Sequence, residues 1–176
     1  SIPCVAFDYA DSNVTGVFSN NKEAMKELTR YLISLGHKRI VFVHGEQSRA
    51  TDKRIEGFKE AMNEAGIALR DDTLVPARYL DVDSVANITR NLMRRILPPT
   101  AILYPDDRSA IRALSTLQSL GLTCPGDVSI AGFDGLEISQ IVSPHLTTVK
   151  QDTAKIGKIL AKELIDLIEK KKEEKS

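Results

Sequence analysis

The sequence predicts an α/β fold built on a doubly wound parallel sheet. Short apolar runs alternate with segments in which apolar residues recur every three or four positions, a pattern typical of strands alternating with helices. The runs are apolar throughout rather than at every second position, as expected for strands buried on both faces of a sheet. Helices of about ten to fifteen residues between such strands indicate parallel pairing, with a layer of helices on each face.

The apolar runs that we expect to form strands are short, and each is followed by polar residues or by the start of a predicted helix. The run at Leu74–Val75 is the weakest of them. The expected strands are Cys4–Phe7, Ile40–Val43, Leu74–Val75, Ala101–Tyr104, Val128–Ala131 and Thr147–Val149.

Most of the predicted helices have a polar residue where they begin, an apolar stripe along one face, and a stop signal. Asn20 followed by Glu23 resembles a capping box, and Gly36 ends the stripe that follows. Pro98 and Pro99 end the third helix, because proline cannot continue it. The expected helices run from Asn20 to Gly36, from Asp52 to Gly66, over Val85–Ile96, from Asp106 or Asp107 to Gly121, and from Asp152 through Ile168.

The charge balance argues against a polyanionic partner for this chain. The 24 basic and 24 acidic residues cancel, so no net field attracts nucleic acid or an anionic membrane. No apolar run reaches membrane-spanning length, and the first residues do not resemble a signal peptide. Cys4 and Cys124 lie far apart without a C-x-x-C pattern, so we expect buried thiols of a cytoplasmic protein rather than a disulfide.

The sequence predicts neither a metal nor a cofactor. His37, His44 and His145 lack the spacing of metal ligands, and glycine-rich phosphate loops are absent.

An enzyme could use Asp106 and Asp107 as a carboxylate pair. Adjacent side chains on a strand-to-helix turn diverge, however, and this disfavours a shared general acid and base.

A set of short motifs occurs in order along nearly the whole chain. These motifs are Ile2–Asp8, Leu35–Ile40, Arg54–Phe58, Pro105–Asp107, Ile130–Asp134 and Pro144–Asp152. Each motif is weak alone, but together they resemble the effector-binding region of the LacI/GalR (lactose-repressor) family of bacterial transcription regulators.

The resemblance implies two Rossmann-like lobes of the periplasmic-binding-protein type that clamp a small molecule between them. Residues 12–146 resemble the carboxyl-proximal lobe. Residues 1–11 resemble a fragment of the first lobe, and residues 147–176 resemble the crossover strand and helix of that lobe plus a charged tail. The family's helix-turn-helix has no counterpart here, so the chain resembles a truncated part of a homodimeric regulator whose missing headpiece contacts operator DNA.

Arg54 and Asp134 match effector-contacting residues of that family. The guanidinium of Arg54 offers a fork of donors suited to vicinal hydroxyls or a carboxylate, whereas the alternative is a surface arginine paired with Glu56 or Asp52. Asp134 can accept two hydroxyl hydrogen bonds, whereas the alternative is a helix cap. The resemblance implies a sugar or a sugar phosphate as the effector.

Further candidates are less specific. Asp106 stands where many members of the family carry asparagine, and it could equally cap the helix that follows. Asp8 ends the first strand, and Arg49 lies in a loop that reaches the ligand in relatives or is merely solvated. Tyr104 and Phe133 end strands and could stack on a ring face, although Phe133 is also a natural core residue.

Another class of function remains open. A solute-binding protein of a sugar transport system would use the same two-lobe fold, but the Gly36–Ile40 motif favours a transcriptional regulator. We expect a binding protein rather than an enzyme, and turnover of a bound ligand would exclude both binding functions.

Overall fold

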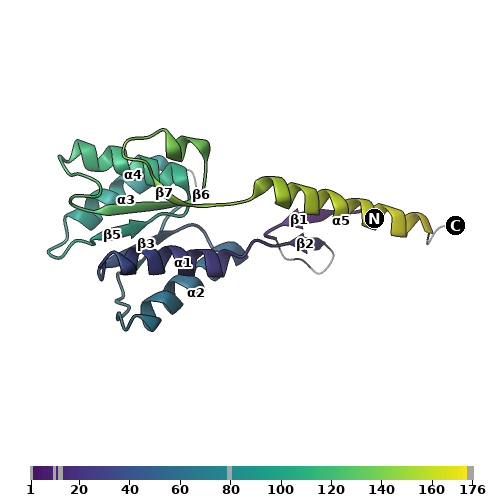
Figure 1. Cartoon of the computed structure of the whole chain (residues 1–176), viewed down its shortest axis with the longest axis horizontal. Coiled ribbons are helices and arrows are strands. Elements are labelled where there is room, and N and C mark those ends of the chain that lie inside the picture. Colours follow the sequence, from purple (N-terminus) through teal and green to yellow (C-terminus); the bar gives the residue numbers. More distant parts are fainter. Residues whose placement is uncertain (1, 10, 12–13, 79–80, 174–176) are drawn as a thin grey trace. The chain divides into compact units, whose positions relative to one another are not determined.

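The computed structural model describes residues 2–9, 11, 14–78 and 81–173 (Figure 1). The chain divides into two compact units. The larger unit comprises residues 21–150, and the smaller unit comprises residues 1–20 and 151–176. Each unit is described by itself.

The larger unit is a five-stranded parallel sheet with helices on both faces, which confirms the predicted fold class. Its strand order is β4-β3-β5-β6-β7. The strands are β3 (Ile40–His44), β4 (Leu74–Pro76), β5 (Ala101–Leu103), β6 (Ser129–Asp134) and β7 (Thr147–Lys150). The helices are α1 (Asn21–Ser34), α2 (Arg49–Glu64), α3 (Val82–Met93) and α4 (Asp107–Ser119), and a short 3-10 helix, η1, spans Glu137–Gln140.

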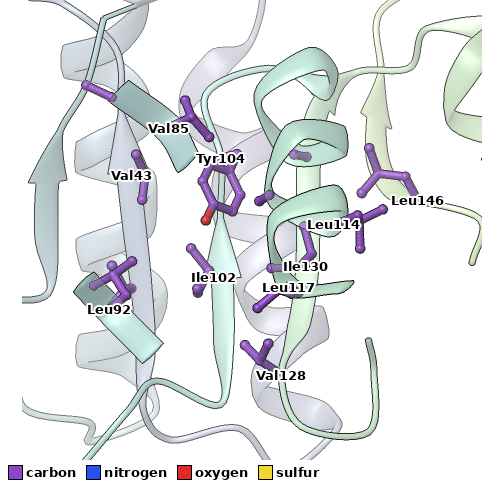
Figure 2. Packing of buried hydrophobic residues seen from close by; sticks show 14 residues of the cluster. Val43, Val85, Leu92, Ile102, Tyr104, Leu114, Leu117, Val128, Ile130 and Leu146 are labelled. Atoms are coloured by element: carbon purple, nitrogen blue, oxygen red, sulfur yellow. The ribbon is translucent and has the colours of Figure 1, made fainter. Parts of the chain in front are cut away.

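Successive residues of each central strand face opposite layers, because side chains alternate across a sheet. Phe42 packs in the cluster under α1 and α2, together with Met25, Phe58 and Phe133. Val43 and Ile102 pack on the other face, and Figure 2 shows them beside Val85 and Leu92 of α3 and Leu114 and Leu117 of α4. Burial on both faces explains why these strands read as continuous apolar runs.

Two predicted helix boundaries are wrong. Helix α2 begins at Arg49, because Ser48 is extended and its hydroxyl accepts a hydrogen bond from the Thr51 N–H at 3.1 Å. Asp52 therefore lies in the first turn instead of capping the helix, and Arg54 lies one turn further along than expected. Helix α3 ends at Met93, and Ile96, which we placed on its apolar stripe, is 100% exposed.

The smaller unit contains β1 (Val5–Phe7), β2 (Thr15–Val17) and α5 (Thr153–Glu173). Strand β2 was not predicted, since a three-residue strand with Gly16 at its centre has no apolar run. It pairs with β1 in parallel, with Ala6 opposite Gly16. Strand β7 pairs with β6 and so lies in the larger unit, whereas the boundary drawn from the sequence assigned it to the first lobe.

The two cysteines are free thiols. Cys124 is half-buried, and burial raises the pKa of its thiol above the ordinary value. Cys4 is exposed, so the expectation of two buried thiols is wrong for this residue. In the part of the chain that the structure describes, no helix is both long and apolar enough to span a bilayer.

Candidate functional site

The carboxyl ends of β3, β5 and β6 lie at one edge of the sheet of the larger unit, because the three strands are adjacent and parallel. Open α/β sheets bind their ligands at this edge. The segments that follow these strands lead to Arg54, to Pro105 with Asp106, and to Asp134. Residues that are remote in sequence are thereby gathered at one edge.

Arg54 is held by groups from three other segments of the chain. Its Nε–H donates to Oδ1 of Asn21 and its Nη1 donates to the carbonyl oxygen of Pro105, both at 2.8 Å. Its guanidinium carbon lies 3.6 Å from the centre of the Phe133 ring. The side chain is buried, with 6% exposed, so it is not the surface arginine paired with Glu56 or Asp52 that we considered as the alternative.

Asp106 caps helix α4. Its Oδ1 accepts from the Ser109 N–H at 2.8 Å and its Oδ2 accepts from the Ser109 hydroxyl at 2.9 Å. An aspartate suits this position because the first N–H groups of a helix lack partners within the helix. The capping alternative considered for Asp106 is therefore present, and Asp106 directly follows Pro105, whose carbonyl oxygen accepts from Arg54.

Asp107, by contrast, points into the protein and joins three elements. It is fully buried at the start of α4, where it accepts hydrogen bonds from the N–H of Leu136, at 2.7 Å, and from the hydroxyl of Thr148 in β7. Burial raises the pKa of its carboxyl group, and the hydrogen bonds from Thr148, Leu136 and Gly135 oppose that rise. Asp106 and Asp107 thus have different surroundings, which argues against a shared acid–base pair.

Asp134 ends β6 in an unusual backbone conformation. Its φ is 114°, and Gly135 follows with a φ of 69°. A positive φ is costly for a residue with a Cβ, and such strain is found most often at functional sites. The buried carboxylate of Asp107 binds the next segment through Leu136, so it stabilises the turn that carries Asp134.

The two aromatic candidates differ in position. Tyr104 is completely buried among the residues of the cluster under α3 and α4 (Figure 2). Its hydroxyl lies 2.7 Å from the hydroxyl of Thr89. Burial raises the pKa of Tyr104 above its ordinary value. The expectation that Tyr104 stacks on a ligand conflicts with this packing. Phe133 packs on the opposite face of the sheet, where Arg54 covers its ring.

The last two candidates are Asp8, in the smaller unit, and Arg49, at the start of α2. Asp8 belongs to the smaller unit, has a φ of 49°, and accepts hydrogen bonds from the N–H and the hydroxyl of Ser19. Arg49 is exposed and is the first residue of α2 rather than part of a loop. The structure therefore links Arg54, Phe133 and the Pro105–Asp106 turn directly.

The sequence did not predict three groups of this site. They are the Asn21 side chain, the Pro105 carbonyl, and the buried Asp107 carboxylate that hydrogen-bonds Leu136 and Thr148. A backbone carbonyl has no signature in a sequence, and the sequence drew attention to Asn20 as the helix cap rather than to Asn21. The residues that the structure describes contain no cluster of three or more His, Cys, Asp or Glu side chains that could hold a metal ion.

Comparisons with known proteins identify the family to which this fold belongs. Residues 29–176 match the family model of the periplasmic binding protein-like domain. The probable HTH-type transcriptional repressor ExuR of Bacillus subtilis is 33% identical over 171 residues, which are 96% of this chain and 51% of that protein. The chain spans about half the length of the curated relatives it matches.

Solved structures give the same result. A LacI transcriptional regulator from Bacillus cereus subsp. cytotoxis has a TM-score of 0.88 and 34% identity, covering 96% of this chain and 61% of that one. A LacI-family regulator from Enterococcus faecium, solved with bound ribose, has a TM-score of 0.87 and 27% identity, covering 95% and 62% of the two chains. These relatives are described as transcriptional regulators, and they confirm the resemblance found in the sequence. The chain belongs to the periplasmic binding protein-like domain family, in the form found in LacI-family regulators.

Proposed function

We propose that this chain is the effector-sensing domain of a LacI-type transcriptional repressor, and that it binds a small hydroxyl-rich molecule at the carboxyl edge of its larger sheet. The observation that carries the proposal is the buried guanidinium of Arg54, fixed by Asn21, Pro105 and Phe133. Arg54, Asp106 and Asp134 follow or end parallel strands at the same end of the sheet, and a guanidinium with two carboxylates offers the donors and acceptors that a sugar requires.

The roles of the residues follow from their chemistry. Arg54 donates to ring or hydroxyl oxygens, while Asp134 accepts from a pair of hydroxyls and the strained turn limits its movement. Asp106 accepts at the edge of the site when its hydrogen bonds to Ser109 leave a lone pair for the ligand. Arg49 and, by the family resemblance, Asp8 remain candidate effector contacts.

The charges favour a neutral sugar over a sugar phosphate. Two carboxylates and one guanidinium leave the site with one net negative charge, because Asp106 stands where an uncharged asparagine is usual in the family. A phosphate group would be repelled by that excess charge. The solved relative from Enterococcus faecium contains ribose, which is a neutral sugar.

In the whole protein, effector binding would change the relative stability of two arrangements of the lobes, and so the position of DNA-binding headpieces. This requires an effector that binds the two arrangements with different affinity. The expected parent is a homodimer in the cytoplasm that contacts operator DNA through a helix-turn-helix outside this chain. A transport solute-binding protein is the less favoured alternative, because the relatives are described as transcriptional repressors and regulators.

The test is an NMR titration of the isotope-labelled chain with D-ribose, D-ribose 5-phosphate and adenine at millimolar concentration. We expect D-ribose to shift the amide signals of residues 106, 107 and 134–136 and to bind more tightly than its phosphate. Arg54→Ala and Asp134→Asn should abolish the shifts. Arg70→Ala and Asp83→Asn, which alter exposed side chains elsewhere, should not.

Two outcomes would contradict the proposal. The absence of any shift with all three compounds would argue against small-molecule sensing by this chain. Shifts that survive both site variants would place the ligand elsewhere on the chain. Tighter binding of the phosphate would keep the site but reverse the argument from charge.

A further inference from the structure

We propose that Asn21 is a positioning residue of the effector site, which holds Arg54 in the orientation that receives the ligand. The inference rests on the proposed function, because it assigns a role to a residue that acts through Arg54. Asn21 is the first residue of α1 and is 3% exposed. Its Oδ1 accepts the Nε–H of Arg54 at 2.8 Å.

The hydrogen bond to Asn21 restricts a rotation of the Arg54 guanidinium that the contacts with Phe133 and Pro105 do not prevent. Stacking on Phe133 holds the guanidinium against the ring, and the bond to Pro105 fixes one corner of it. A guanidinium that is stacked on a ring and hydrogen-bonded through Nη1 can still rotate in its own plane about that nitrogen. A second hydrogen bond, from Nε, prevents this rotation and fixes the direction of the remaining N–H donors.

The backbone is shaped to bring Asn21 within reach. Gly57 lies one turn after Arg54 on the same helix, and a Cβ at this position would overlap the carbonyl oxygen of Lys22. Lys22 follows Asn21, so the close approach of α1 and α2 at Gly57 lies next in sequence to the Asn21–Arg54 hydrogen bond. A side chain at position 57 would separate the helices at this point and move Asn21 away from Arg54.

The expected effect follows from pre-organisation. Ordering a rotamer-rich side chain on binding costs about 0.5–1.5 kcal/mol, and an arginine that is already ordered does not incur this cost when the ligand arrives. Loss of the Asn21 acceptor should therefore weaken effector binding by up to about tenfold, since 1.4 kcal/mol corresponds to a factor of ten.

The experiment compares three variants of the chain. Asn21→Leu keeps the approximate volume and removes the acceptor. Asn21→Asp keeps an acceptor at the same place. Asn87→Leu is the matched control, because Asn87 accepts from Arg90 Nη1 at 3.0 Å on the exposed surface of α3, away from the site.

The first readout needs no ligand. In NMR spectra of chain labelled at arginine Nε, the Arg54 Hε should exchange slowly with water in the wild type and in Asn21→Asp, because the proton is buried and hydrogen-bonded. Asn21→Leu should speed this exchange at least about tenfold, and Asn87→Leu should leave it unchanged. The second readout is the affinity for D-ribose, which should fall in Asn21→Leu and not in Asn87→Leu.

The outcomes separate the inference from the function on which it rests. Unchanged Hε exchange in Asn21→Leu, or equal loss of protection in Asn21→Asp, would overturn the positioning role. Faster exchange with unaltered D-ribose affinity would also overturn it, since Asn21 would then be purely structural. If Asn21→Leu does not fold, Asn21→Ala, which also removes the acceptor, replaces it in both readouts. A wild-type chain with a protected Arg54 Hε that binds no sugar would instead contradict the proposed function.

Discussion

The guanidinium carbon of Arg54 lies 3.6 Å from the centre of the Phe133 ring, and Phe133 immediately precedes Asp134. A cation over the face of an aromatic ring is attracted by the ring's quadrupole, and burial increases this attraction. The contact therefore connects α2 to the end of β6 and joins Arg54 to Phe133, both of which are predicted effector-binding residues.

The coupling between Arg54 and Phe133 can be measured with a double-mutant cycle. Phe133→Leu and Arg54→Met each remove the cation–π contact while keeping an apolar side chain in place. We expect each variant to lower the free energy of unfolding by about 1–3 kcal/mol, with a coupling energy of about 1 kcal/mol. Urea unfolding of the wild type, the two single variants and the double variant provides the measurement. If the effects of the two substitutions on the free energy of unfolding are strictly additive, the coupling energy is zero and the cation–π contact does not contribute to stability.

A second prediction concerns the close approach of α1 and α2 at Gly57. Gly57→Ala should lower the free energy of unfolding by about 1–3 kcal/mol, because the new methyl group overlaps the carbonyl oxygen of Lys22. The control is the same substitution at Gly157 of α5, where a Cβ would meet no other atom within 4 Å. Gly157→Ala should be neutral or stabilise by up to about 1 kcal/mol, because alanine favours helix. Thermal unfolding of Gly57→Ala and Gly157→Ala, monitored by circular dichroism, provides the comparison. Equal changes in stability in the two variants would contradict the packing at Gly57.

A third prediction tests the position of Tyr104. The hydroxyl of Thr89 donates to the Val85 carbonyl at 2.8 Å and lies 2.7 Å from the Tyr104 hydroxyl. Tyr104→Phe removes one partner of a buried hydrogen bond and should cost about 1 kcal/mol of stability. It should leave D-ribose affinity unchanged, because Tyr104 packs under α3 and α4, on the face opposite Phe133. A loss of D-ribose binding without a loss of stability would restore Tyr104 as a ligand contact.

The strands of the larger unit could be predicted because burial on both faces leaves uninterrupted apolar runs, such as Ile40–Val43. The same sequence could not reveal β2, where a short strand with Gly16 at its centre contributes to a sheet of only two strands. Alternation along β5 puts Tyr104 on the same face as Ile102, but only the register of β5 and β6 shows that Phe133 lies on the opposite face.

The site was predictable to the extent that strand ends determine it. Arg54 and Asp134 follow neighbouring parallel strands, so their proximity follows from topology. The partners of Arg54 did not follow, since the contact with Asn21 depends on how closely two helices approach at Gly57. Asp106 and Asp107 are adjacent and chemically identical in the sequence. Only the direction of each side chain makes Asp106 the cap of α4 and Asp107 a buried acceptor for the Leu136 N–H.

The last prediction uses the buried carboxyl group of Asp107. Its pKa in the folded chain is raised above 3.8, chiefly by burial, so the folded state binds a proton more readily than the unfolded state. The contribution of Asp107 to the free energy of unfolding is therefore fully present below the unfolded pKa. It is lost as the pH rises through the folded pKa.

Urea unfolding of the wild type and Asp107→Asn at several pH values isolates this contribution, because the variant lacks the titrating group. The stability of the wild type relative to Asp107→Asn should increase as the pH falls from neutral toward 3.8. Asp127→Asn is a control of opposite sign, because hydrogen bonds from the N–H and hydroxyl of Thr123 lower the pKa of Asp127. The advantage of the wild type over that variant should shrink as the pH falls below 3.8. An NMR titration of the Leu136 amide, which donates to Asp107, gives a direct check, and a midpoint at or below 3.8 would contradict the raised pKa.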